Sequence, residues 1–163
     1  MISRRACLAL PLLLAAAPAG AHHVQFEVLR PGDFAARVAA RSGKAFLLVL
    51  WSLACEPCRP DLELLRELRR RHPAMPLALL STDGVALQEA AGKVLLAHGL
   101  EHEANWIMVN RNNRALREEI DPAWDGAVPR AYFYDASGRR EALAGPLDRR
   151  RLEAWLASLE PAA

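Results

Sequence analysis

The chain has 163 residues, of which 52% are apolar and 25% charged, and its formal charge at pH 7 is only +2. Such a composition is typical of a globular domain and excludes a disordered or low-complexity chain. With so little net charge, the sequence gives no electrostatic basis for binding nucleic acid.

The first 21 residues have the parts of a secretory signal peptide. Two arginines form a basic start, residues 6–17 are apolar, and Ala19-Gly20-Ala21 is a small-residue cleavage site. The apolar stretch is shorter than the roughly 20 residues that a membrane-spanning helix needs, which argues against the alternative of an uncleaved anchor. We therefore expect cleavage after Ala21 and a periplasmic or secreted protein, exported by the general secretory or the twin-arginine route.

The mature chain would comprise residues 22–163 and carry no formal charge, because the leader removes two arginines and no acid and leaves 19 basic and 19 acidic residues. Its length of about 142 residues suits one domain with a hydrophobic core. Outside the cytoplasm, thiols are oxidised unless something keeps them reduced, so a pair of cysteines there forms a disulfide by default.

Strand and helix patterns alternate along the mature chain. In chain order we expect a strand at 24–29, a helix at 31–41, a strand at 46–51, a helix at 56–71, a strand at 77–81, a helix at 85–98, a strand at 106–109, a helix at 113–119, a strand at 131–134, its hairpin partner at 140–143 and a helix at 148–159. The 46–51 run is apolar throughout, as is typical of a parallel strand covered on both faces. The predicted fold is α/β, a central mixed sheet flanked by helices.

Cys55 and Cys58 are the only cysteines of the mature chain, since Cys7 leaves with the leader. They start the 56–71 helix, where residues three apart lie about 5–6 Å from each other, within the roughly 4.4–6.8 Å that a disulfide spans between Cα atoms. Three interpretations compete: a structural disulfide, half of a metal site, or a redox couple. A disulfide that closes so short a loop adds little stability, which argues against the first.

A metal site needs more ligands than this pair provides, since a structural zinc ion usually takes four. The mature chain offers five further candidates, all histidines more typical of the surface: His22, His23, His72, His98 and His102. We therefore expect no resident metal or other cofactor. The alternative to a redox couple is a copper metallochaperone that holds copper between the two cysteines, and the histidine pair at the mature start could capture copper weakly.

The redox interpretation assigns different roles to the two cysteines. The unpaired amides and the dipole of a helix N-terminus favour a thiolate, so we expect Cys55 to be the nucleophile. Cys58, one turn into the helix, is expected to be more buried and to release mixed disulfides as the resolving thiol. Glu56 is expected to raise the pKa of Cys55 and make the dithiol a stronger reductant, unless its side chain is exposed and inert.

Five segments of the chain carry a family resemblance: WSLACEPC at 51–58, Ala127-Val128-Pro129, the strand AYFYD, the turn SGR and GPLDRRRLEAWL near the C-terminus. Together and in this order they resemble the thioredoxin superfamily, and above all exported disulfide reductases of the TlpA/ResA type. The resemblance covers about residues 24–159 and implies a thioredoxin-like fold. The strand and helix expected within 106–119 fit the strand–helix insert that such proteins carry before their cis-proline.

By this resemblance Pro129 is the cis-proline that faces the cysteines and leaves the backbone of Val128 free to pair with an extended substrate segment. Trp51 is implied to pack beside the active-site loop. Together with the roles argued above for the cysteines and Glu56, the expected site residues form two groups. The catalytic ones are Cys55, Glu56, Cys58 and Pro129, and the substrate-binding ones are Trp51, Pro57 and Val128.

Several positions depart from the family pattern. Val49 stands where relatives often have Asp or Asn, Ala54 where they have Trp, and Arg130 where they have Thr after the cis-proline. Pro60 replaces a helix proline that is usually found a few residues later. Without a polar residue at position 49, the sequence shows no evident proton acceptor for the buried thiol.

The resemblance implies an enzyme, an exported thiol-disulfide oxidoreductase that reduces disulfides of protein substrates. Substrates in this group include apocytochrome c before haem attachment and copper-site thiols during oxidase assembly. The internal disulfide would then be reduced by a membrane thiol-disulfide electron donor. We expect a monomer that binds no nucleic acid.

We predict that the mature chain begins at His22 and lies outside the cytoplasm, because a small-residue cleavage site precedes this position. N-terminal sequencing of the protein purified from cells that express the full chain checks the prediction. Recovery of a soluble cytoplasmic form that retains Met1 would contradict it.

Overall fold

The apolar run Phe46–Trp51 forms β2, and all six of its residues are buried. β2 lies inside the sheet, parallel to β3 (Leu77–Ser81) on one side and antiparallel to β5 (Arg130–Tyr134) on the other. The structure, a computed structural model, describes residues 23–111 and 113–159. A strand that is apolar on both faces must be covered on both, and two layers of helices do this here.

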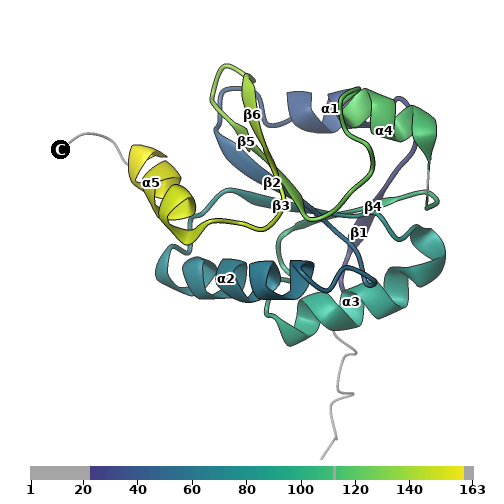
Figure 1. The fold of residues 1–163 in the computed structure, drawn as a ribbon, viewed down its shortest axis with the longest axis horizontal. Helices are drawn as coiled ribbons and strands as arrows, with labels where there is room; N and C mark the ends of the chain where they lie inside the picture. Colours follow the sequence, from purple (N-terminus) through teal and green to yellow (C-terminus); the bar gives the residue numbers. More distant parts are fainter. Residues whose placement is uncertain (1–22, 112, 160–163) are drawn as a thin grey trace, which may run out of the picture.

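The sheet of the described residues has six strands in the order β1-β4-β3-β2-β5-β6 (Figure 1). Its other strands are β1 (Phe26–Leu29), β4 (Ala104–Met108) and β6 (Arg140–Ala144). The first four strands in this order are parallel, β5 runs antiparallel to β2, and β6 runs antiparallel to β5. This confirms the predicted mixed sheet, in which β4 has entered between β1 and β3.

The part of the chain that the structure describes has five α-helices: α1 (Phe34–Ala39), α2 (Cys58–Arg71), α3 (Gln88–Ala97), α4 (Arg114–Ile120) and α5 (Arg149–Leu159). α1 and α4 lie side by side on one face of the sheet, at the top of Figure 1. α2, α3 and α5 cover the other face. The strand β4 and the helix α4 are the unit expected before Pro129.

Alternate side chains of β2 enter two separate cores, because successive residues of a strand point to opposite faces. Leu47 and Val49 pack with the inner faces of α2, α3 and α5, in a core that also holds both cysteines and is called here the dithiol core. Leu48 and Leu50 pack with residues of α1 and α4 in the second core. The dithiol core therefore extends without interruption from the central strand to the cysteines.

The predicted bounds of the two most buried strands, 46–51 and 77–81, are confirmed to the residue, whereas other element ends differ. The helix expected at 31–41 starts only at Phe34, because the amide of Arg30 donates to the carboxylate of Asp33 at 2.9 Å and closes a turn before it. The helix expected at 85–98 divides into a short 3-10 helix, η1 (Val85–Leu87), and α3. Parallel pairing with β1 and β3 shifts the strand expected at 106–109 to 104–108.

The predicted leader, residues 1–21, lies outside the described residues, as does His22. The cleavage site and the start of the domain at residue 22 therefore stay predictions. Within residues 23–111 and 113–159, no helix has the length and apolar character needed to cross a membrane.

Candidate active site

The two cysteines form a disulfide at the start of α2. Their Sγ atoms lie 1.98 Å apart and their Cα atoms 5.3 Å apart. Cys55 is 7% exposed and Cys58 only 1% exposed. The first cysteine is thus the more accessible sulfur and the second the more buried one, which agrees with the order expected for a nucleophile and a resolving thiol.

The start of α2 is built by the backbone of the loop, and no side chain caps it. The amide of Cys58 donates to the carbonyl of Cys55 at 3.2 Å. Pro57 precedes the first helical residue, and Pro60 lies within the first turn, where a missing amide costs no intrahelical hydrogen bond. Both prolines are therefore compatible with a helix that begins at the second cysteine.

The side chains around the disulfide divide into an exposed and a buried group. Ala54, Glu56 and Pro57 are exposed, so they form the outer surface of the loop. Trp51 is 1% exposed and packs in the dithiol core, so it supports the loop from the inside. The glutamate therefore lies on the solvent side of the loop, and the tryptophan beneath it.

A buried aspartate, Asp83, holds the chain that leads from β2 to the cysteines. Its carboxylate accepts the amide of Leu53 at 2.9 Å and the hydroxyl of Ser81 at 2.9 Å. The amide of Thr82 donates to the carbonyl of Trp51 at 3.0 Å. The end of β3 thus positions the loop before Cys55. The sequence analysis missed Asp83, whose signal is a carboxylate two residues after a buried strand.

Pro129 lies beside the end of β2. The peptide bond between Val128 and Pro129 is cis, as the family resemblance implied, and Pro129 is buried. Leu50 pairs with Arg130 across β2 and β5, so the register places Pro129 next to Trp51. Val128 packs against the dithiol core. The structure therefore brings the cis-proline and the cysteines to the same end of the sheet.

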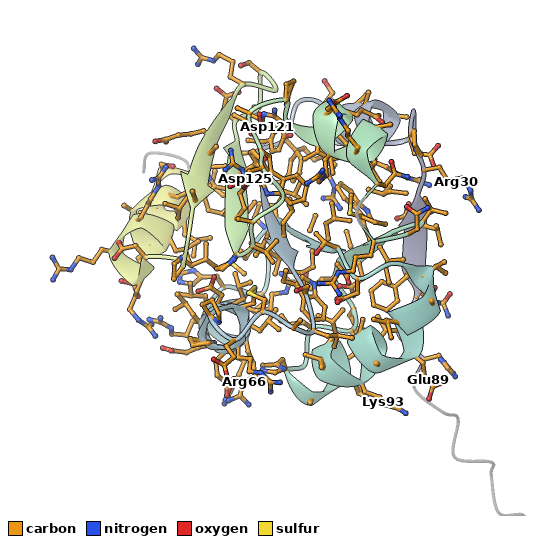
Figure 2. The ribbon with its side chains drawn as sticks, turned by 45° about the vertical axis from the view of Figure 1, so that its right-hand side comes forward. Arg30, Arg66, Glu89, Lys93, Asp121 and Asp125 are labelled. Atoms are coloured by element: carbon orange, nitrogen blue, oxygen red, sulfur yellow. A yellow bond between two sulfur atoms is a disulfide. The ribbon has the colours of Figure 1, made fainter. Side chains whose placement is uncertain are left out.

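Arg130, which stands where relatives have threonine, belongs to a partly buried ionic network. Its Nη2 donates to Oδ2 of Asp121 at 2.7 Å, and its Nε donates to the hydroxyl of Tyr132 at 2.6 Å. The Tyr132 hydroxyl donates to the same carboxylate oxygen at 2.9 Å. Figure 2 shows Asp121 and Asp125 in the loop between α4 and β5, which carries Pro129. Because Asp121 and Arg130 lie at the two ends of this loop, their ion pair closes it.

Asp61, one turn after Cys58 on α2, is a site residue that the sequence analysis missed. It is 3% exposed, and its Oδ1 accepts the amide of Leu147 at 3.0 Å. Its Oδ2 is buried and has no hydrogen-bond partner within the described residues. Burial raises the pKa of Asp61 to about 6, and the hydrogen bond from Leu147 only partly offsets this. An ionisable group with a pKa near neutrality thus lies three residues from the buried cysteine.

The signal that could have found Asp61 is its position within the apolar stripe of α2. Residues three and four apart share a helix face, so Asp61 lies on the same face as Cys58, Leu62 and Leu65, all of them buried. Val49, at the position where relatives often have a polar residue, is buried in the dithiol core. The buried carboxyl group nearest in sequence to Cys58 therefore lies on the helix, and the strand has none.

Two of the histidines considered as metal ligands, His98 and His102, contact neighbouring residues of the chain. Nδ1 of His98 lies 2.8 Å from the carbonyl of Val94 on its own helix, and His102 lies 3.6 Å from the carboxylate of Glu101. Within residues 23–111 and 113–159, no group of three or more His, Cys, Asp or Glu side chains is placed to hold a metal ion.

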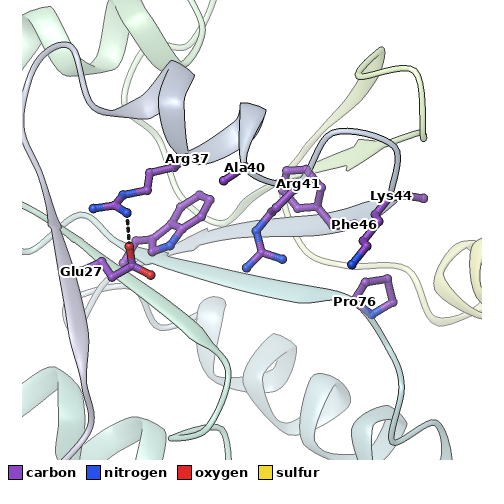
Figure 3. Close-up of a pocket in the computed structure, with 9 residues that line it drawn as sticks. Glu27, Arg37, Ala40, Arg41, Lys44, Phe46 and Pro76 are labelled. Atoms are coloured by element: carbon purple, nitrogen blue, oxygen red, sulfur yellow. Dashed lines mark ion pairs between the residues drawn. The ribbon is translucent and has the colours of Figure 1, made fainter.

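A separate hollow lies at the opposite end of β2 from the cysteines (Figure 3). It has a volume of about 300 Å³, and Glu27, Arg37, Arg41, Lys44, Phe46 and Trp106 are among the residues that line it. The guanidinium of Arg41 lies 5.1 Å from the ring centroid of Phe46 and 5.6 Å from that of Trp106. Since β2 rises about 3.3 Å per residue, this hollow is roughly 16 Å from the dithiol end.

The fold of this chain is similar to the folds of several solved structures. One is a secreted disulfide oxidoreductase from Mycobacterium tuberculosis described as homologous to DsbE of E. coli, which is 18% identical over 74% of this chain and 86% of that chain, with a TM-score of 0.59. A second is a thiol:disulfide interchange protein of the thioredoxin family from Chlorobium tepidum, 17% identical over 74% and 83%, with a TM-score of 0.56. A third is StoA from Bacillus subtilis, 18% identical over 71% and 84%, with a TM-score of 0.52.

These likenesses show that the chain has a thioredoxin-like fold, as the sequence predicted. They are consistent with the resemblance to exported reductases of the TlpA/ResA type. No protein-family model matches the sequence, and no curated protein matches it either. The fold is therefore established by the structure, and the activity is argued from the site.

We predict that Asp121→Asn lowers the free energy of unfolding by about 2 kcal/mol at pH 7, because it leaves the Arg130 guanidinium without its charged partner. Although burial opposes its ionisation, hydrogen bonds from Ala123, Arg130 and Tyr132 hold the pKa of Asp121 below its usual value of 3.8. The carboxylate therefore stabilises the fold above that pH, and its contribution is lost only as the pH falls further. Urea unfolding at pH 7 and pH 5 is the measurement.

Asp125→Asn is the matched control, since this exposed side chain of the same loop accepts a hydrogen bond from the amide of Ala127 that an asparagine can keep. The free energy of unfolding of Asp125→Asn should fall by less than about 0.5 kcal/mol, as is usual for surface substitutions. Equal losses for both variants would show that the ion pair does not hold the loop.

We predict that Asp61→Asn removes a fall in stability between pH 4 and pH 6. The folded-state pKa of Asp61, about 6, lies above its value of 3.8 in an unfolded chain. The folded protein therefore binds more protons in this window, and its stability falls as the pH rises through it. Asparagine keeps an oxygen for the amide of Leu147 and has no charge to bury.

Urea unfolding of the oxidised protein at four values from pH 4 to pH 7 tests this. The variant should match the wild type near pH 4 and exceed it at pH 7. If the difference between the two proteins does not change with pH, the carboxyl group of Asp61 does not titrate as described.

Proposed function

We propose that the protein is an exported thiol-disulfide oxidoreductase that reduces disulfides of protein substrates. The observation that carries the proposal is the Cys55–Cys58 disulfide at the N-terminus of α2, at the same end of the sheet as the cis bond before Pro129. The bond joins residues three apart with a Cα separation of 5.3 Å, within the normal disulfide range, so it can open and close without a change in the rest of the fold. The solved disulfide oxidoreductase and interchange protein with this fold support the same activity.

The proposed reaction is a dithiol–disulfide exchange in two steps. The Cys55 thiolate attacks one sulfur of the substrate disulfide, which forms a mixed disulfide and releases the first substrate thiolate. The Cys58 thiolate then attacks Sγ of Cys55, which forms the internal disulfide and releases the second substrate thiolate. The substrate gains two electrons, and the protein loses them. An external dithiol must supply two electrons to restore the reduced form.

Asp61 is proposed to accept the proton of Cys58 before the second step. Its pKa of about 6 lies below the ordinary cysteine pKa of about 8.5, so the carboxylate is ionised at neutral pH and can take the thiol proton. The buried Oδ2 has no other donor within the described residues. This assignment supplies the proton acceptor that Val49 does not provide.

The other predicted site residues receive proposed roles that follow from their exposure. Val128 presents its backbone to an extended substrate segment, because the cis bond to Pro129 turns the chain beside the cysteines. Pro57 adds an exposed apolar surface next to the disulfide, and Trp51 supports the loop from beneath. Glu56 is exposed between the cysteines, so its proposed role in favouring the reducing direction stands beside the alternative of an inert surface side chain.

Export and the electron donor belong to the same proposal. The Mycobacterium tuberculosis protein with this fold is described as secreted, and residues 1–21 of this chain have the parts of a signal peptide. In an oxidising compartment a reductase depends on a donor that crosses the membrane, so we propose a membrane thiol-disulfide donor as the partner. Apocytochrome c and copper-site thiols are the proposed substrates, and the monomer the proposed form.

We predict that Cys58→Ala accumulates mixed disulfides with substrates through Cys55, because no second thiol remains to displace them. Cys55→Ala should trap at least about tenfold less, since Cys58 is buried and attacks only its neighbour. Both variants are expressed with the leader, and adducts are recovered after acid quenching and identified by mass.

The double variant Cys55→Ala/Cys58→Ala controls for adducts that do not depend on either thiol. Equal trapping by the two single variants would show that the nucleophile is misassigned. No trapping by either variant, together with tight copper retention by the wild-type protein, would favour the copper metallochaperone instead.

A further inference from the structure

We propose that a small cationic pocket beside the dithiol binds an acidic side chain of the substrate, next to the disulfide that is reduced. The pocket has a volume of about 100 Å³, and Ser52, Thr82, Arg111, Arg117 and Val128 are among the residues that line it. The proposal rests on the proposed function and adds a substrate class to it: disulfides with Asp or Glu close to one cysteine.

The position of the pocket relates it to the reaction. Ser52 follows β2 directly, and its carbonyl accepts the amide of Cys55 at 3.2 Å. Val128, whose backbone is proposed to pair with the substrate, forms part of the same wall. An extended chain advances about 3.3 Å per residue, so a side chain one or two residues from the attacked cysteine can reach this pocket. Its volume is well above the roughly 10–15 Å³ that one water molecule needs, which leaves room for a carboxylate.

Two arginines and no aspartate or glutamate are among the residues that line the pocket. Within the described residues, Arg111 forms no ion pair, and the only side-chain hydrogen bond of Arg117 runs from its Nη1 to the carbonyl of Asp125, at 2.9 Å. Nε of Arg117 is buried and has no partner there. A buried donor without an acceptor costs free energy, and the paired donors of a guanidinium fit a carboxylate. These unmet donors favour an anionic group in the pocket.

The neighbouring carboxylates of the protein are occupied elsewhere. Asp83 accepts from the amide of Leu53 and the hydroxyl of Ser81. Asp125 accepts from the amide of Ala127 at 2.9 Å. Neither side chain lines the pocket. In the part of the chain that the structure describes, the positive charge of the pocket is therefore left for a ligand.

Two glycines allow close packing against the two arginines of the pocket. Gly126 has a φ of +98°, and a Cβ there would collide with the guanidinium of Arg117. Gly84 has a φ of +89°, and a Cβ there would lie 2.7 Å from the backbone nitrogen of Arg111. The loop after β4 thus packs directly on the loop after β3. The backbone of Arg111 is therefore held at the wall of the pocket before a substrate arrives.

The test measures how fast the reduced protein reacts with three peptides that share one intramolecular disulfide and carry Glu, Gln or Lys at the residues beside its cysteines. The rate constant for the Glu peptide should exceed that for the Lys peptide at least about fivefold, with Gln between them, because charges at a rim mainly change association. Arg111→Gln should reduce this ratio to about two, and Arg111→Glu should invert it. Salt at about 1 M, where the screening length is about 3 Å, should abolish most of the preference.

Arg150→Gln and Arg150→Glu are matched controls, because Arg150 is exposed on α5 and its variants change the net charge by the same amount. They should keep the wild-type ratio. Equal rates for the three peptides in the wild type would overturn the pocket proposal and leave the reductase intact. An unchanged preference in Arg111→Glu would also overturn it. If no peptide oxidises the reduced protein, the proposed function fails, and the pocket proposal fails with it.

Discussion

A central strand that is buried on both faces determines where the chemistry of this protein lies. β2 has no charged side chain and all six of its residues are buried, so helices must cover both of its faces. α2 begins only seven residues after the strand ends. The apolar stripe of α2 must then pack back on the sheet, which holds its first turn at the carboxyl end of β2. The same strand pairs with β5 through Leu50 and Arg130, and this register carries Pro129 to the same place. One buried strand thus positions both halves of the site.

The predictable part of the fold was the part in which burial alone determines structure. The strands at 46–51 and 77–81 were predicted to the residue, because burial on both faces leaves an unbroken apolar run that ends where the chain reaches the surface. The predicted start of α1 was wrong by three residues. The side chain of Asp33 stabilises a turn there, and the pattern of apolar residues gives no sign of it. The shift of β4 has a different cause, since the strands that pair with it are distant in sequence.

The candidate site also has residues that the sequence predicts and residues that it does not. The cysteine pair and the cis-proline could be found because spacing and resemblance mark them. The residue type of Asp61 does not indicate a site residue, because a carboxylate in a helix rich in charged residues is normally predicted to face solvent. Its hydrogen bond comes from the amide of Leu147, 86 residues further along the chain. The pocket between Ser52, Arg111 and Arg117 likewise forms only when three distant segments meet.

Asp61 and Asp121, two of the three buried aspartates near the site, show how the same side chain serves two purposes. Asp121 has donors for its charge, so its pKa is lowered and the fold gains from its ionisation. Asp61 has one backbone donor and a buried oxygen without any within the described residues, so burial raises its pKa. A core that needed only stability would be served better by an apolar side chain at position 61, because an unpaired buried carboxyl costs free energy. Its position one turn from Cys58 fits a group that gains and loses a proton, and such groups are typical of active sites.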